Sequence, residues 1–491
     1  MRFNSLAFLV FLPLFAAAYW STSGRLRLWV MLIASLIFYA WWDWRFVFLL
    51  LFSSLVDYSL GILLENEQDE SLRKQLIVIS VAINLGVLGF FKYFNFFVGS
   101  AAQISNSLGL RATYDALKIV LPVGISFYVF KTMSYTIDVY RRTEKAERDL
   151  LRFTTFVVFF PELVAGPIVR ASRMLPQLAR DHRFRYERMV SGLMLVASGY
   201  VRKVAIADSI APLVDIRFAH PEAHNALSLL LGVYLYAFQI YCDFSGYSSI
   251  AIGLARIFGF DFGINFDRPY FSRSFSEFWS RWHISLSSWL RDYLYIPLGG
   301  NRGGTLLTIR NLMLTMLLGG LWHGASWTFV AWGALHGTYL VIQRFIAPYY
   351  RRLFRALRVP AFASNVFLVL LVFHLTCFGW IFFRASSFAN AWQMLSGIAS
   401  FHGAHLADID NRGRILKCVV MVGVLLMFEA ATFLPKRRKA VLPTAEDERV
   451  TVSAHPVEAP AWLRLAFIAA CVWVVLIFGS FSGSNFIYFQ F

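Results

Sequence analysis

The stretch IRNLMLTMLLGGLWHGASWTFVAWGALHGTYLVIQRF, residues 309–345, decides the fold class. It is too long for a single membrane crossing, which needs about 20 apolar residues. Gly319-Gly320 and Gly324 interrupt it. Non-helical backbone is tolerated at membrane depth only where it is buried in protein or lines a cavity. The interruptions therefore predict an interior site, because a plain membrane anchor would run unbroken.

Apolar runs of spanning length recur along all 491 residues, of which 58% are hydrophobic and 15% charged. A soluble protein would be about half apolar and a quarter charged. We therefore expect an all-α polytopic membrane protein, a single membrane domain over 1–491 with about 11–13 transmembrane or re-entrant helices. The expected spans lie near 5–20, 26–44, 46–64, 76–98, 117–137, 153–170, 189–206, 228–258, 309–345, 365–384, 415–434 and 462–481.

The charge is unevenly balanced, with 46 Lys and Arg against 29 Asp and Glu, a net +17. Cytoplasmic loops of membrane proteins collect Lys and Arg, so the basic loops 141–152 and 435–439 are expected in the cytoplasm. The polar stretch 440–460 is expected to be a flexible cytoplasmic loop. Nucleic-acid binding is not expected, because no basic run is interleaved with a base-reading fold.

Two histidines are candidates for chemistry. His323 lies between glycines and two tryptophans inside the apolar run, and imidazole can take and return a proton near neutral pH. His283 ends the segment FSEFWSRWH, 275–283, which predicts an amphipathic helix at the interface with Trp279 and His283 on one stripe. In the same segment Glu277 and Arg281 form a favourable i, i+4 pair. From spacing alone, each histidine is equally compatible with a purely structural role.

No metal site is expected. His336 follows His323 by thirteen residues, which in one continuous helix is about 220° around the axis and ~20 Å along it. The two histidines could share a metal only across a sharp break. No HExxH motif, CxxC pair or carboxylate cluster accompanies them. The four cysteines lie in apolar runs and predict buried thiols.

Several stretches resemble the membrane-bound O-acyltransferase family, most nearly its bacterial branch for alginate, cellulose, peptidoglycan and teichoic acid. They are LPVGISFY at 121–128, AGP at 165–167, DFSGYS at 243–248, FW and RWHISLS within 278–287, LWHG at 321–324 and the tail FIYFQF at 486–491. The resemblance implies helices around a central tunnel, no bound cofactor, and an acyl donor from the cytoplasm, expected to be acetyl-CoA.

The resemblance also implies residue roles. His323 takes the place of the essential catalytic histidine, and His283 that of a second, more variable one. Acyl transfer needs a base and an oxyanion stabiliser, for which Trp322, Asn311 or backbone amides are candidates. Tyr488 in the tail is a candidate acyl relay, because a related D-alanylation system has a membrane peptide with a similar tail; an interfacial aromatic belt is the alternative. Further candidates for donor binding or support are Arg281, Arg291, Asp292 and Arg302, and the positive potential of the three arginines suits the phosphates of coenzyme A.

The predicted function is a membrane O-acetyltransferase of the bacterial inner membrane that passes acetyl groups outward onto a secreted polysaccharide. Alginate is the first expectation, with cellulose and peptidoglycan as alternatives. The expected partners are periplasmic or membrane-anchored polysaccharide acetylation proteins, together with membrane lipid. A transporter would also use broken helices and buried charges, but it predicts inverted repeats that the sequence does not show. A structural scaffold has no need of buried ionisable groups.

Overall fold

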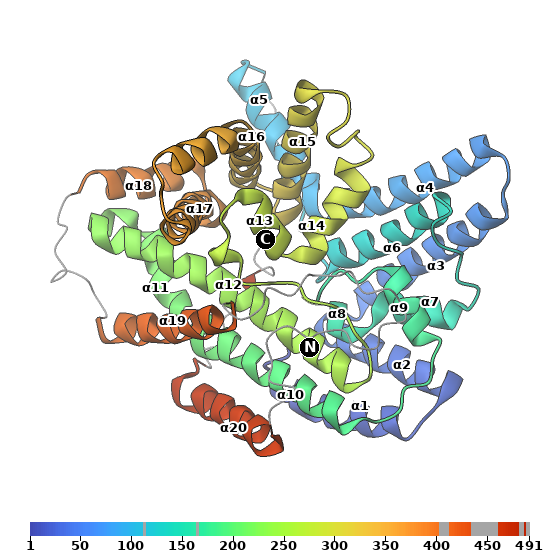
Figure 1. Cartoon of the computed structure of the whole chain (residues 1–491). Helices are drawn as coiled ribbons and strands as arrows, with labels where there is room; N and C mark the ends of the chain where they lie inside the picture. Colours follow the sequence, from blue (N-terminus) through green and yellow to red (C-terminus); the bar gives the residue numbers. More distant parts are fainter. Residues whose placement is uncertain (111–113, 164–165, 402–411, 434–459, 481–485, 488–491) are drawn as a thin grey trace. The chain divides into compact units, whose positions relative to one another are not determined.

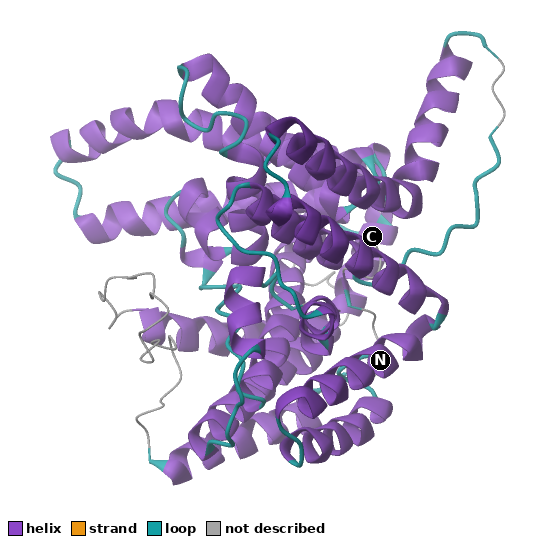
Figure 2. Cartoon of the chain, turned by 90° about the vertical axis from the view of Figure 1, so that its right-hand side faces the viewer, coloured by secondary structure: helices purple, strands orange, loops and turns teal. Residues whose placement is uncertain are grey.

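The computed structural model describes residues 1–110, 114–163, 166–401, 412–433, 460–480 and 486–487. All regular structure in these ranges is helical, without a strand (Figures 1 and 2). In lipid a helix satisfies its own backbone hydrogen bonds, which explains this uniformity. Eight helical segments of the described chain are long and apolar enough to cross a membrane. The predicted all-α, multi-pass membrane architecture is therefore confirmed.

The chain divides into two compact units. The first holds Met1–Phe184 and Phe258–Phe383 among the described residues. Its elements are α1 Leu6–Trp20, α2 Gly24–Asp43, α3 Arg45–Asn66, α4 Glu70–Leu88, the π-helical turn η1 Gly89–Tyr93, α5 Phe94–Ser107, α6 Ile125–Tyr140, α7 Leu150–Val158, α8 Phe160–Leu163, α9 Ala171–Leu178, η4 Pro269–Phe271, α13 Phe275–Arg281, α14 Ile284–Leu290, η5 Arg291–Tyr295, α15 Thr305–His323, α16 Trp327–Ala356 and most of α17 Ala361–Arg384.

The second unit holds Arg185–Ile257 and the described part of Arg384–Ile487. Its elements are α10 Tyr186–Tyr200, the π-helical turn η2 Val201–Ala207, α11 Asp208–Ala219, η3 Pro221–Ala223, α12 Ala226–Ile257, α18 Phe388–Ala399, α19 Arg412–Phe433 and α20 Ala461–Phe478. The longest of these, α12, is also the most deeply buried of the candidate spans.

A buried ion cluster ties the second unit together. Lys203 in η2 lies 2.8 Å from Asp208 and 2.6 Å from Asp243, and all three side chains are buried. The other carboxylate oxygen of Asp243 accepts a hydrogen bond of 2.7 Å from the backbone amide of Ile487. Buried charges are tolerated only when they are paired and hydrogen-bonded. The cluster therefore fixes η2, α12 and the start of the C-terminal tail in one arrangement.

Of the interruptions predicted within 309–345, the one at Gly324 is a break between two helices, whereas Gly319 and Gly320 lie inside α15 and do not interrupt it. α15 ends at His323 and α16 begins at Trp327, with Gly324 extended between them (φ −162°, ψ 151°). The Ser326 side chain caps α16 by accepting a hydrogen bond of 3.3 Å from the amide of Thr328. Such a cap satisfies one of the free amides at the start of a helix. The chain thus turns back on itself directly after His323.

Two glycines let α15 and α16 approach closely. A Cβ atom added to Gly320 would lie 2.3 Å from the carbonyl oxygen of Phe329, and one added to Gly333 would lie 2.3 Å from that of Met316. Neither helix backbone has room for a side chain at these two points. The pair therefore sets the spacing of the two helices beside His323.

Gly320→Ala is expected to destabilise the protein by about 1–3 kcal/mol, because the added methyl group forces α15 and α16 apart. The measurement is the midpoint of thermal unfolding in detergent. Gly86→Ala in α4 is the matched control, since a Cβ atom there meets nothing within 4 Å. That control should be neutral or slightly stabilising. Equal midpoints for the two variants would contradict the close approach.

Candidate active site

His323 is the last residue of α15 and is buried. The last carbonyl groups of a helix have no partner within it. Here Lys92 Nζ donates to the carbonyl oxygens of Trp322 at 2.6 Å and His323 at 3.1 Å. Tyr93 Oη donates to the carbonyl oxygen of Leu321 at 2.9 Å. The π-helical turn η1 thus caps α15, and its ammonium group complements the negative end of the helix dipole.

Aromatic rings enclose the His323 imidazole. Its ring centroid lies 5.0 Å from Trp322, 5.1 Å from Trp332 and 5.2 Å from Phe383, and all three contacts are edge-to-face. Trp322 also contacts His283, at 5.9 Å, and Trp332 contacts His336, at 4.8 Å. Three buried histidines are therefore linked by two tryptophans.

His283 lies at a break that the sequence did not predict. α13 ends at Arg281 and α14 begins at Ile284, and His283 between them is left-handed (φ 43°, ψ 55°) and buried. The expectation of one amphipathic helix carrying Trp279 and His283 on a single stripe is therefore wrong. A non-glycine residue in this conformation costs about 1–3 kcal/mol, and such strain is concentrated at functional sites.

Asn265 holds this break in place. Its backbone carbonyl accepts from the amide of Ile284 at 2.9 Å. Its side-chain oxygen accepts from the amide of Ser285 at 3.2 Å and from the Ser285 hydroxyl at 2.9 Å, and lies 3.3 Å from His283 Nδ1. Sequence reasoning missed Asn265, because it lies in an irregular loop without periodicity or a motif.

Asn311 does not lie beside His323. The two residues are twelve positions apart in α15, which corresponds to ~18 Å along the helix axis. The Asn311 amide donates to the carbonyl oxygen of Gly300 at 3.0 Å, and its side-chain oxygen accepts from Arg310 at 2.9 Å. Asn311 therefore anchors the glycine-rich turn that precedes α15. Of the two side chains considered for the oxyanion, the structure brings only Trp322 next to His323.

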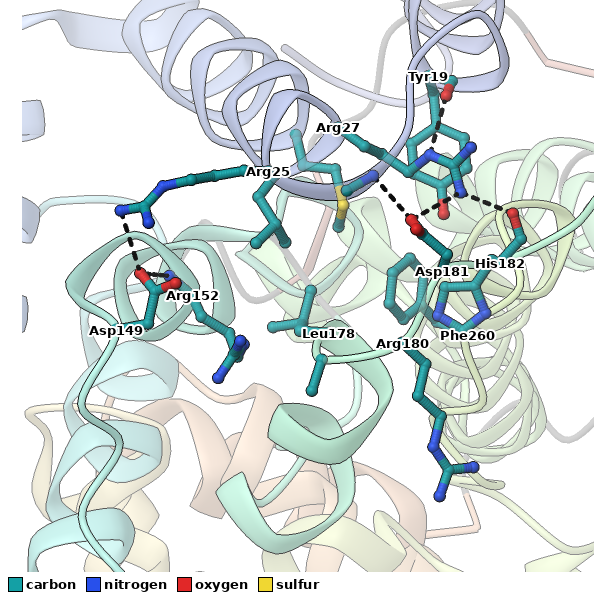
Figure 3. Close-up of a pocket in the computed structure, with 14 residues that line it drawn as sticks. Tyr19, Arg25, Arg27, Asp149, Arg152, Leu178, Arg180, Asp181, His182 and Phe260 are labelled. Carbon is teal, nitrogen blue, oxygen red and sulfur yellow. Dashed lines mark hydrogen bonds and ion pairs between the residues drawn. The ribbon is translucent and has the colours of Figure 1, made fainter.

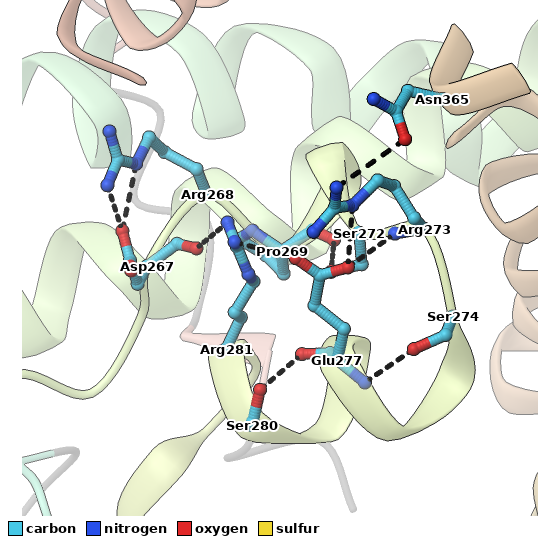
Figure 4. Close-up of polar contacts among 10 residues, drawn as sticks. All are labelled: Asp267, Arg268, Pro269, Ser272, Arg273, Ser274, Glu277, Ser280, Arg281 and Asn365. Atoms are coloured by element: carbon cyan, nitrogen blue, oxygen red, sulfur yellow. Dashed lines mark hydrogen bonds and ion pairs between the residues drawn. The ribbon is translucent and has the colours of Figure 1, made fainter. Parts of the chain in front are cut away.

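Arg281 is held by carboxylate and carbonyl partners. The predicted pair with Glu277 is present at 2.7 Å. Glu277 also accepts a hydrogen bond from the backbone amide of Arg273 at 2.8 Å. The Arg273 guanidinium group donates to the side-chain oxygen of Asn365 at 3.4 Å (Figure 4). Arg281 additionally approaches the carbonyl oxygen of Asp267 at 3.5 Å. This network ties α13 to the loop before it and to α17.

Asp292 is the centre of a separate basic cluster. It pairs with Arg291 at 2.7 Å and also with Arg170. Arg170 and Arg141 lie over the ring of Tyr293, at 5.1 and 5.3 Å from its centroid. Burial would raise the pKa of Asp292, but hydrogen bonds from Arg291 and Arg170 outweigh it and hold the pKa below its usual value. The cluster is rich in guanidinium groups, which suits it to phosphate.

The remaining predicted site residues lie elsewhere. Arg302 is exposed in the turn before α15, with its backbone amide bonded to the carbonyl oxygen of Gly299 at 2.9 Å. Tyr488, the basic loop 435–439 and the stretch 440–459 lie outside the described residues. The described part of the chain holds no group of three or more His, Cys, Asp or Glu side chains that could bind a metal ion.

Comparison with known proteins identifies the class. Residues 140–383 match the membrane-bound O-acyltransferase family. The chain is 40% identical to the probable alginate O-acetylase AlgI of Azotobacter vinelandii, with both chains covered completely. It is 31% identical to the peptidoglycan O-acetyltransferase of Helicobacter pylori, covering 95% of this chain and 91% of the relative. It is 32% identical to the teichoic acid D-alanyltransferase of Streptococcus thermophilus, covering 45% and 56%.

The fold, the membrane spans and these matches define a multi-pass membrane O-acyltransferase. The chain belongs to the membrane-bound O-acyltransferase family, as its sequence motifs predicted. The matched range contains His283, His323 and the tryptophans between them.

Lys92→Met is expected to lower kcat for acyl transfer by roughly 10- to 100-fold with little change in KM, because a small displacement of a reacting group has effects of this size. Lys92 acts through the backbone of α15, so it is a positioning residue. Lys74→Met is the control, since Lys74 is an exposed lysine of the preceding helix. A wild-type kcat for Lys92→Met, with normal membrane insertion, would show that the capping contacts do not position His323.

Proposed function

We propose that the protein transfers acetyl groups from cytoplasmic acetyl-CoA through the bacterial inner membrane for O-acetylation of a secreted polysaccharide, with alginate as the first candidate. The observation that carries the proposal is His323 at the break between α15 and α16, enclosed by aromatic rings and capped by Lys92. The full-length similarity to an alginate O-acetylase supports the choice of polymer.

In the proposed reaction His323 is the general base. It takes the proton from the acceptor hydroxyl as the hydroxyl oxygen attacks the carbonyl carbon of the acetyl thioester. The resulting tetrahedral intermediate collapses by breaking its bond to sulfur, and the proton passes from the imidazole to the departing thiolate. A well-placed base contributes roughly 10²–10⁴-fold in rate.

The oxyanion of the intermediate needs a hydrogen-bond donor. Trp322 supports this role better than Asn311 does, because its ring contacts both His323 and His283. Backbone amides beside Gly324 are the other donors within this region of the chain. His283, positioned by Asn265, is proposed to orient Trp322 through their ring contact. It is also proposed to make a second polar contact with the substrate.

The phosphates of coenzyme A are proposed to bind at the cluster around Asp292. Arg291 is 63% exposed in its side chain, so its guanidinium group is accessible to an anion. Arg302, also exposed, is a second contact in this proposal. Arg281 is a weaker candidate, because its guanidinium group already pairs with Glu277 and donates to the carbonyl oxygen of Asp267.

The acceptor is proposed to belong to a partner protein. Periplasmic or membrane-anchored acetylation proteins would receive the acetyl group and place it on the polymer. Tyr488 is retained as a candidate relay to such a partner, and it directly follows Ile487, whose amide is bound by Asp243. Peptidoglycan is the second candidate polymer, because of the similarity to a peptidoglycan O-acetyltransferase over most of both chains.

His323→Ala is expected to abolish transfer of radioactive acetyl groups from acetyl-CoA in membrane vesicles, because the base is lost. Membrane fractionation and the thermal midpoint should stay close to wild type. His374→Ala in α17 is the control, since it removes an exposed histidine. Normal acetyl transfer by His323→Ala would contradict the assignment of His323 as the base. Equal losses of transfer in both variants would point to a general effect of histidine removal.

Arg291→Gln is expected to raise KM for acetyl-CoA roughly tenfold with kcat nearly unchanged, because one charge-assisted hydrogen bond to phosphate is lost. Steady-state kinetics in vesicles would measure both constants. Arg352→Gln on α16 removes an exposed arginine away from the cluster and serves as the control. An unchanged KM for Arg291→Gln would place the donor phosphates elsewhere.

A further inference from the structure

A basic cavity lies in the first unit, and its lining does not include His283, His323 or His336 (Figure 3). It has a volume of about 270 Å³ and lies among the start of α2, the start of α7 and the segment after α9. A water occupies ~30 Å³ of liquid, so a phosphate group with its ester oxygens fits. The charged residues that line it are Arg25, Arg27, Arg152, Arg180, Asp149 and Asp181.

The two carboxylates of this cavity already accept hydrogen bonds from backbone amides. Asp149 caps α7 by accepting from the amide of Leu151 at 2.9 Å. Asp181 accepts from the amide of Gly24 at 2.8 Å. Each also lies near one arginine at the limit of ion pairing. Arg25 is 4.0 Å from Asp149, and Arg27 is 3.9 Å from Asp181. Four guanidinium groups and two carboxylates give the lining residues a formal charge of +2, of which Glu147, paired with Arg152, offsets one.

The arginines of the cavity differ in how fully they are bonded. Arg27 is committed to the structure, with its guanidinium donating to the carbonyl oxygens of Thr22 and His182. Arg152 donates to Glu147 at 3.0 Å, while its buried Nε has no hydrogen-bond partner among the described residues. Arg25 is 74% exposed in its side chain. Arg180 is exposed. Arg25, Arg152 and Arg180 therefore have donors to spare for an anion.

The position of the cavity indicates the source of that anion. α2 is a candidate membrane span that begins at Gly24, and its Leu26, Trp29 and Ile33 are exposed apolar side chains. The first turn of a span lies at the level of the lipid headgroups. The arginine-rich loop 141–152, whose last residues line the cavity, is expected on the cytoplasmic side. The cavity thus lies where the phosphates of the cytoplasmic leaflet are found.

We propose that this cavity binds the phosphate of an anionic phospholipid. Arg25, Arg152 and Arg180 donate hydrogen bonds to the phosphate oxygens. Four apolar side chains that line the same cavity contact the glycerol and the first methylene groups of the lipid; they are Leu28, Met31, Leu178 and Phe260. Basic pockets beside cytoplasmic ends of membrane helices recognise lipid headgroups in this way. The site is independent of the proposed acetyl transfer.

The test is native mass spectrometry of the full-length protein in detergent with added dioleoylphosphatidylglycerol or dioleoylphosphatidylcholine. The wild type is expected to retain phosphatidylglycerol and to show no comparable retention of phosphatidylcholine. Arg25→Gln with Arg180→Gln should weaken phosphatidylglycerol binding roughly fivefold for each arginine, roughly 25-fold together. The control is Arg351→Gln with Arg352→Gln, a pair of exposed arginines on α16, and it should bind like the wild type. Should the double variant fold poorly, Arg180→Gln alone should give the fivefold loss.

Three results would overturn the proposal. The first is equal phosphatidylglycerol binding by the wild type and the Arg25, Arg180 variant. The second is an equal loss in the α16 control, which would show only a general effect of positive charge. The third is displacement of phosphatidylglycerol by adenosine 3′,5′-bisphosphate together with arginine-dependent binding of that nucleotide, which would assign the cavity to a soluble phosphate compound.

Discussion

The free carbonyl groups at the end of α15 are the constraint on which the site depends. A helix that stops inside a membrane protein leaves several carbonyl oxygens without partners, and water is not available to solvate them. Lys92 and Tyr93 supply the missing donors to residues 321–323. Because they do so, the chain can end one helix at His323 and begin another four residues later. The π-helical turn η1 presents both donors at once, from neighbouring positions.

The aromatic rings around His323 restrict the orientation of its imidazole. Three edge-to-face contacts restrict the plane of the imidazole, and the side chain is buried. Orientation of this kind is commonly provided by a carboxylate hydrogen-bonded to the histidine. At His323 the three ring contacts and the capped end of α15 contribute to this positioning. The same principle applies to His283, where Asn265 and a strained backbone fix the ring.

The sequence predicted the helical class, the break near Gly324, the Glu277–Arg281 pair and the family, because each of these depends on local composition, spacing or a contiguous motif. It did not predict the break at His283, because helical periodicity continues through that residue and only Asn265, eighteen positions earlier, interrupts it. Nor did it assign Lys92 to the site, since that contact joins residues 231 positions apart. Asn311 was placed too near His323, because closeness in sequence within one helix still means separation along its axis.

The contact between Asp243 and Ile487 involves a main-chain amide, which every residue except proline possesses. The hydrogen bond itself therefore does not depend on which side chain stands at 487. Asp243 is paired in turn with Lys203, so the charged groups behind this contact lie in η2 and α12. Proline at 487 is the substitution that removes this donor.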